Sequence, residues 1–226
     1  MTDLLMKYQP DTIKEFIGNR VLIRGFLDSL SKSPCEVLII GPSGGGKTLL
    51  CNLTLKEFEH KYDVLRINGD ETEDVKSLKR LIDNFVNNRT IESFFSSKQK
   101  LVLFDNVDIL LTSDRNTASF LLNFVENAQK QKHVSYIMTC STSEEKRLTE
   151  LKKKVQCIRL SNPSRQDTFV YVSAILDTED IHHDSNKLLR LIDTHNNNIR
   201  NIVLNLHQMS MSDKDLTAEK KNQIDV

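Results

Sequence analysis

An eight-residue stretch, Gly41 to Thr48, restricts what this chain can fold into more than any other feature. It reads Gly-Pro-Ser-Gly-Gly-Gly-Lys-Thr and fits the phosphate-loop pattern G-x-x-x-x-G-K-[ST] at every fixed position. The chain has seven glycines, and four of them lie in this stretch, where backbone N–H groups must approach phosphate closely. The pattern therefore predicts a nucleotide site.

The residues of this loop have separate expected roles. Lys47 is expected to contact the β- and γ-phosphates and the Thr48 hydroxyl to bind Mg²⁺, while the following helix adds the partial positive charge of its N-terminus. The alternative is a plain glycine-rich turn, which the flanking apolar strand 36–40 and helix 49–59 disfavour. The predicted nucleotide-binding set is the loop and the next residue: Gly41, Pro42, Ser43, Gly44, Gly45, Gly46, Lys47, Thr48 and Leu49.

Composition sets outer limits on the function. A chain of 226 residues can hold one α/β domain with a smaller appendage. Lys+Arg and Asp+Glu both number 31, so a nucleic-acid contact must come from local patches and not from an overall basic field. No apolar run of about eighteen residues and no leader pattern occurs, which predicts a soluble intracellular protein without a membrane contact.

The cysteines indicate neither a zinc site nor a disulfide framework. Cys35, Cys51, Cys140 and Cys157 are far apart and form no C-x-x-C pair. We therefore expect buried thiols in a reducing compartment.

Apolar patterns along the chain predict strands that alternate with helices, as a parallel sheet requires. Strands are expected at 36–40, 62–68, 101–104, 134–140 and 155–160, with helices at 21–30, 49–59, 71–89, about 116–125, 164–176, 187–194 and from 199. The third strand ends in Asp105, where a phosphate-loop enzyme places its second Mg²⁺ ligand. A strand-end aspartate that only caps a helix or turn is the simpler alternative.

Several segments resemble the clamp-loader ATPases of the replication factor C family, a branch of the AAA+ ATPases. Lys7-Tyr8-x-Pro10 followed by Ile17-Gly18 is similar to the N-terminal box that lies against the adenine in that family. The resemblance implies that Tyr8, Pro10 and Ile17 contact the nucleotide, although Gln9 replaces the usual arginine. An N-terminal arm that packs on the core is the alternative.

The resemblance also assigns roles at the γ-phosphate. Ser141 occupies the position of a polar sensor at a strand end, and Arg200, in Asn-Ile-Arg-x-x-Val-x-x-Leu, matches the family's sensor-2 arginine. Asn106 stands where most relatives carry the glutamate that polarises the attacking water, and an amide cannot take a proton. The alternatives are a serine that turns the chain and a solvated arginine.

Two further segments favour the large subunit of that family over its small subunits. Asp114-Arg115 lies at the interval after the Asp105 strand at which the large subunit carries Asp-Arg, although a helix start capped by Asp114 is an equal alternative. The small subunits carry an arginine finger in Ser-Arg-Cys before the last strand, whereas this chain has Lys152-Lys153-Lys154 there. A lysine run can also be a solvated face or contact DNA phosphate.

Together these residues predict an α/β AAA+ P-loop core with a five-stranded parallel sheet over 1–160, a small helical lid over 161–209 and a polar, disordered tail over 210–226. The implied function is an ATP- and Mg²⁺-binding clamp-loader subunit that acts with other subunits, a sliding clamp and primer-template DNA, at the site of DNA replication and in the nucleus of a eukaryotic host. Asn106 leaves ATP turnover open. The alternatives are a non-hydrolysing nucleotide-bound scaffold and an initiator or checkpoint ATPase.

Overall fold

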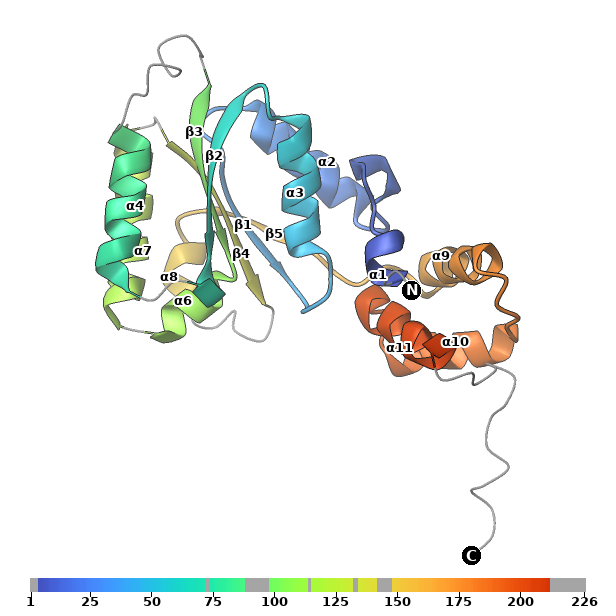
Figure 1. Cartoon of the computed structure of the whole chain (residues 1–226). Coiled ribbons are helices and arrows are strands. Elements are labelled where there is room, and N and C mark those ends of the chain that lie inside the picture. The colour runs from blue at the N-terminus through green and yellow to red at the C-terminus, as the bar shows by residue number, and fades with distance from the viewer. Residues whose placement is uncertain are drawn as a thin grey trace, which may run out of the picture. The chain divides into compact units, whose positions relative to one another are not determined.

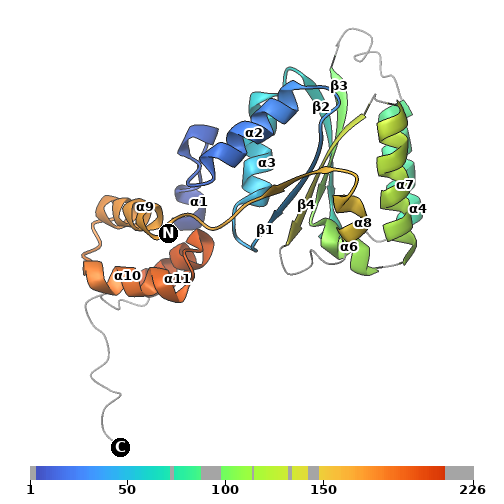
Figure 2. The same ribbon diagram turned by 180° about the vertical axis from the view of Figure 1, so that it is seen from behind.

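The computed structural model describes residues 4–71, 74–87, 98–113, 115–131, 134–141 and 148–211. They form two compact units, one from Arg20 to Leu160 and one that joins residues 4–19 to residues 161–211. Figures 1 and 2 show both units from opposite sides.

The first unit is built on a parallel sheet of five strands in the order β2-β3-β4-β1-β5. This confirms the predicted sheet. The strands are β1 (Glu36–Gly41), β2 (Tyr62–Asn68), β3 (Gln99–Asp105), β4 (Val134–Ser141) and β5 (Gln156–Arg159). The central strands β1, β3 and β4 are nearly continuous apolar runs because helices cover both faces of the sheet.

Helices α2 and α3 lie on one face of the sheet and α4, α6 and α7 on the other (Figures 1 and 2). Phe124 of α7 makes edge-to-face contacts with Phe104 of β3 and Tyr136 of β4, with ring centroids 5.3 and 5.8 Å apart. The helical segments of this unit are α2 (Arg20–Ser31), α3 (Lys47–Glu57), η2 (Gly69–Glu71), α4 (Val75–Asn87), α6 (Val107–Ser113), α7 (Arg115–Gln131) and α8 (Thr149–Lys152).

The second unit is helical. Its elements are α1 (Leu4–Lys7), η1 (Ile13–Glu15), α9 (Arg165–Thr178), α10 (Ser185–Thr194) and α11 (Ile199–Met211). Ser164, the predicted start of α9, caps it by accepting from the Asp167 N–H at 3.0 Å. Asp184, which was not predicted as a cap, accepts from the Lys187 N–H at 3.0 Å at the start of α10. Apolar side chains of the three long helices form the unit's core: Val172, Leu176, Leu188, Ile192, Ile202 and Leu206.

Two predicted boundaries differ from the structure. The predicted core began at Met1, but residues 4–19 group with the helical unit, where Leu4 is buried with Ile175 and Val203. The predicted tail began at residue 210, but α11 continues to Met211. Residues 212–226 lie outside the described residues, as does Asp114.

Candidate nucleotide site

The phosphate loop joins the end of β1 to the start of α3, as its flanking apolar patterns predict. Gly44 and Gly46 have φ values of 73° and 84°, in the left-handed region that residues with a side chain rarely adopt. The Gly45 N–H donates to the Pro42 carbonyl oxygen at 3.0 Å, and a Cβ added at Gly45 would lie 3.0 Å from that same oxygen. The loop therefore depends on glycine at three successive positions.

Lys47 is buried, with 8% of its surface exposed. A buried lysine usually has a partner for its ammonium group. Its Nζ donates to the carbonyl oxygens of Gly41 and Pro42, both at 3.0 Å. These bonds bring the ammonium group back against the loop that precedes it, so that the positive charge lies beside the backbone expected to surround phosphate.

Thr48 and Asp105 meet across the sheet edge. Thr48 Oγ1 donates to Asp105 Oδ2 at 2.8 Å. Mg²⁺ binds oxygen ligands octahedrally at about 2.0–2.1 Å, so two neighbouring ligand atoms lie about 3 Å apart. The hydroxyl and carboxylate oxygens therefore fit two adjacent positions around one Mg²⁺, which would neutralise the phosphates of a bound nucleotide.

Thr139 in β4 is a site residue that the sequence interpretation missed. Its hydroxyl is fully buried, donates to Asp105 Oδ1 and accepts from the Asn106 N–H at 3.0 Å. With Thr48 on the other oxygen, both oxygens of the Asp105 carboxylate are held. The available signal was a hydroxyl in a largely apolar strand, where a buried polar group needs a partner.

Asn106 directly follows β3 in a left-handed conformation, with φ 54°. Its Nδ2 donates to Asp70 Oδ2 at 3.0 Å, so its amide is directed to a carboxylate that follows β2. A Cβ at Gly69 would collide with the Asn106 carbonyl oxygen, so glycine is required where these two turns touch. The sequence interpretation singled out Asn106 but not Asp70.

Ser141 is the last residue of β4 and pairs in register with Gly41, the last residue of the phosphate-loop strand. The carboxyl ends of β1, β3 and β4 thus bring together the phosphate loop, Asp105 and Ser141 on one edge of the sheet. The role of Ser141 as a sensor stays a prediction.

The residues of the N-terminal box lie in the helical unit. The Tyr8 hydroxyl donates to Glu179 Oε1 at 2.5 Å, and this hydrogen bond raises the pKa of the tyrosine. Lys7 pairs with the same carboxylate oxygen at 2.6 Å. Pro10 and Ile17 are partly exposed. Contact of Tyr8, Pro10 and Ile17 with an adenine stays a prediction.

Arg200 is the second residue of α11 and is exposed. Asn198 caps this helix, because its Oδ1 accepts from the Asn201 N–H at 3.2 Å. Ile202 and Leu206 face the helical core, so Arg200 lies off the buried stripe, as predicted. Its side chain makes no ion pair with any residue that the structure describes. The sensor-2 role stays a prediction.

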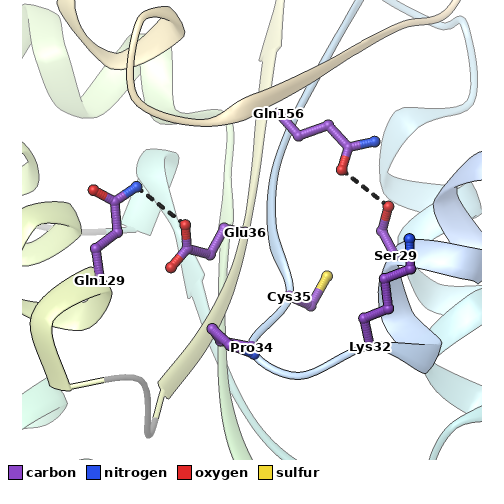
Figure 3. Close-up of a pocket in the computed structure, with 7 residues that line it drawn as sticks. All are labelled: Ser29, Lys32, Pro34, Cys35, Glu36, Gln129 and Gln156. Atoms are coloured by element: carbon purple, nitrogen blue, oxygen red, sulfur yellow. Dashed lines mark hydrogen bonds between the residues drawn. The ribbon is translucent and has the colours of Figure 1, made fainter.

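A pocket of about 430 Å³ lies at the opposite, amino-terminal edge of the sheet. None of the predicted site residues lines it. Figure 3 shows Gln129 directed at Glu36 and Ser29 directed at Gln156, with hydrogen bonds of 3.0 and 3.1 Å. These polar side chains already have partners, so the pocket gives no sign of a missing ligand.

Cysteine chemistry does not contribute to the site. Burial raises the pKa of the Cys35 thiol to about 12, and burial followed by the Asp105 charge raises the pKa of the Cys51 thiol further. None of the four cysteines, all of which lie among the described residues, forms a disulfide. Among the described residues no group of three or more His, Cys, Asp and Glu side chains is arranged to hold a metal ion. None of the described helices is long and apolar enough to cross a membrane.

Comparison with known proteins shows two kinds of similarity. The chain is 26% identical to the replication factor C large subunit of Methanosphaera stadtmanae over 94% of its length, and 22% identical to replication factor C subunit 1 of Saccharomyces cerevisiae over 97%. It spans only 39% and 28% of those proteins. The fold resembles the Thermotoga maritima RuvB Holliday junction branch migration motor, with a TM-score of 0.63, 14% identity, and coverage of 92% of this chain and 68% of RuvB.

The family comparison covers the site itself. Residues 37–158, more than half of the chain, match the model of the ATPase family associated with various cellular activities. The matched segment includes the phosphate loop, Asp105 and Ser141, the residues that meet at the carboxyl edge of the sheet. The chain therefore belongs to the AAA family of ATPases.

Proposed function

We propose that this chain is the ATP-binding part of a clamp-loader subunit similar to the replication factor C large subunit. In this role, bound ATP and Mg²⁺ assemble the chain with other clamp-loader subunits, a sliding clamp and primer-template DNA at the site of replication. The observation that carries the proposal is that likeness to replication factor C large subunits extends over 94% of the chain, and so beyond the family match that ends at residue 158.

The site geometry supports the nucleotide part of this proposal. Lys47 is fixed beside the glycine loop, and Thr48 and Asp105 present two oxygen ligands 2.8 Å apart. The chain would use them to hold the β- and γ-phosphates and Mg²⁺, and Arg200 on α11 would respond to the γ-phosphate. Tyr8, Pro10 and Ile17 would lie against the adenine.

A second candidate is a scaffold that binds ATP without hydrolysing it. Asn106 favours this function, because its amide donates to Asp70 and cannot accept a proton from water. Loss of a general base typically lowers the rate of the chemical step by about two to four orders of magnitude, and it does not remove nucleotide binding.

A reconstitution experiment tests the proposal. The chain is mixed with replication factor C small subunits and the sliding clamp of the same host, with or without ATP, and complexes are separated by size-exclusion chromatography. We expect an ATP-dependent complex for the wild type and none for Lys47→Ala. Binding of ATP without association with either partner would contradict the clamp-loader function, and absence of ATP binding would contradict both candidates.

A further inference from the structure

The partner of the Asn106 amide suggests where a carboxylate for ATP hydrolysis could come from. Asn106 follows Asp105 directly, and its Nδ2 donates to Asp70 Oδ2 at 3.0 Å. A carboxylate and an amide thus form a pair at the end of β3. In this pair the carboxylate is supplied by the turn after β2, and the amide by the residue after β3.

Asp70 is held in place by three features of that turn. β2 ends at Asn68, which is in register with Asp105, the last residue of β3. The Asp70 N–H donates to Asn68 Oδ1 at 3.2 Å, which closes the turn on itself. Gly69 packs so tightly on the Asn106 backbone that no side chain fits there. The Asp70 carboxylate is therefore fixed on the sheet edge that carries the Mg²⁺ ligands.

Among the residues that the structure describes, two other carboxylates near this edge, Asp105 and Asp108, are less suited to accept a proton from water. Both oxygens of Asp105 are engaged, one by Thr48 and one by Thr139. Asp108 in α6 is 7% exposed, and its Oδ1 has no hydrogen-bond partner, so water has little access to it. Asp70 is exposed, and a proton that it accepts can pass to solvent.

We propose that Asp70 is the general base for ATP hydrolysis in this chain and that Asn106 is the residue that positions it. This inference rests on the proposed function. A lone pair of the water oxygen forms a bond to the γ-phosphorus, and the bond from that phosphorus to the bridging oxygen breaks, with its electrons leaving on ADP. The proton of the attacking water passes to the Asp70 carboxylate and then to solvent.

Nucleotide binding to the isolated chain gives a test that needs no partner and no turnover. Asp70→Asn removes a negative charge next to the expected γ-phosphate, so affinity for the non-hydrolysable analogue AMP-PNP should rise about two- to tenfold relative to ADP. Asp63→Asn is the matched control, because Asp63 lies at the other end of β2 and pairs with Lys100. Calorimetric titration measures both ratios.

Each outcome of the binding test has a definite meaning. A rise for Asp70→Asn and none for Asp63→Asn supports the inference. Equal ratios for Asp70→Asn and wild type overturn the inference and leave the proposed function standing. Failure of the wild type to bind AMP-PNP overturns both.

Turnover in the reconstituted complex gives the second test. We expect Asp70→Asn to lower kcat by about two to four orders of magnitude with an unchanged KM, and Asp70→Glu to retain measurable turnover because it keeps the carboxylate. Moving the carboxylate across the pair, in Asp70→Asn combined with Asn106→Asp, should recover part of the loss. Wild-type kcat in Asp70→Asn overturns the inference. So does a wild type that is inactive until Asn106→Glu restores turnover, which supports the scaffold function instead.

Discussion

Thr48 Oγ1 lies 2.8 Å from Asp105 Oδ2, which connects the first turn of α3 to the end of β3 across 57 residues of sequence. This contact places two hard oxygen ligands side by side where Mg²⁺ is expected. Asp105→Asn keeps the shape of the side chain and removes its charge. We expect the Mg²⁺-dependent gain in ATP affinity to fall by about 100-fold, because a metal ligand is weakened directly.

A magnesium titration of ATP binding measures this effect. Asp28→Asn is the control, since Asp28 is exposed on α2 and should leave the titration unchanged. A titration curve for Asp105→Asn that superimposes on the wild type would remove Asp105 from the metal site.

Thr139→Val should weaken Mg²⁺ binding by removing the hydroxyl that holds Asp105 in place. The substitution leaves Asp105 Oδ1 and the Asn106 N–H without their shared hydroxyl partner. We expect Mg²⁺ affinity in the presence of ATP to fall about tenfold and the free energy of unfolding to fall by about 1–3 kcal/mol. Mg²⁺ titration and urea denaturation measure the two effects.

Thr54→Val is a matched control for this prediction. Thr54 is also fully buried, but its hydroxyl bonds only to carbonyl oxygens of its own helix, the nearest being Leu50 at 2.7 Å. Loss of stability in both variants with loss of Mg²⁺ affinity in Thr139→Val alone is the expected pattern. Unaltered Mg²⁺ affinity in both would reduce Thr139 to a packing residue.

Lys47→Ala should remove ATP binding. The substitution deletes the loop's cation, and contacts of a charged donor with phosphate are each strong enough that affinity should drop by about two orders of magnitude or more. Fluorescent-nucleotide titration measures the change. Lys56→Ala, on the exposed last turn of the same helix, should bind ATP as the wild type does. Wild-type affinity in Lys47→Ala would reject the phosphate-loop assignment.

Arg200→Ala should reduce discrimination between ATP and ADP. A sensor contacts only the γ-phosphate, so ATP affinity should fall about tenfold or more while ADP affinity holds. Arg190→Ala is the control, because Arg190 is an exposed arginine on α10. Parallel titrations measure the affinities for ATP and ADP. Equal losses of affinity for the two nucleotides would show that Arg200 is an ordinary solvated arginine and not a γ-phosphate sensor.

The anchoring of the N-terminal arm should depend on pH. Hydrogen bonds from Lys7 and then Tyr8 lower the pKa of Glu179 below the ordinary value of about 4.5. A lowered carboxyl pKa means that the stabilisation is present above pH 4.5 and is lost as the pH falls through the folded-state value. The melting temperature of Glu179→Gln should therefore lie below that of the wild type at pH 7, and the two should converge in acid. A pH-independent difference would contradict this linkage.

The sequence predicted the five strands and the long helices of both units because each produces a local apolar pattern. Glycine spacing and a strand-end aspartate likewise singled out Lys47, Thr48 and Asp105, whose roles toward a nucleotide stay predictions. The contacts of Thr139 with Asp105 and of Asp70 with Asn106 were not predictable in this way. Each joins residues more than thirty positions apart, and nothing in the local pattern specifies which polar side chains meet.

The unit on which the N-terminal segment packs was also not predictable from the local sequence pattern. Leu4 and Tyr8 form a short pattern that fits an arm on either unit, and only the tertiary contacts with Ile175 and Glu179 assign it to the helical one. Helix α6, which contains Asp108, was not predicted either, because a helix of seven residues has little periodic signal.

The strand order determines the stage of synthesis at which the chain can first bind ATP. The phosphate-loop strand β1 has no neighbour among the strands that surround it in sequence, because Ile39 pairs with Thr139 on one side and Ile158 on the other. Contacts of such high sequence separation form slowly, since a long loop must close before any pairing is gained. During synthesis the loop therefore emerges long before its supports. A nascent chain that has not reached β4 should not retain ATP, and binding competence should arise in one late step.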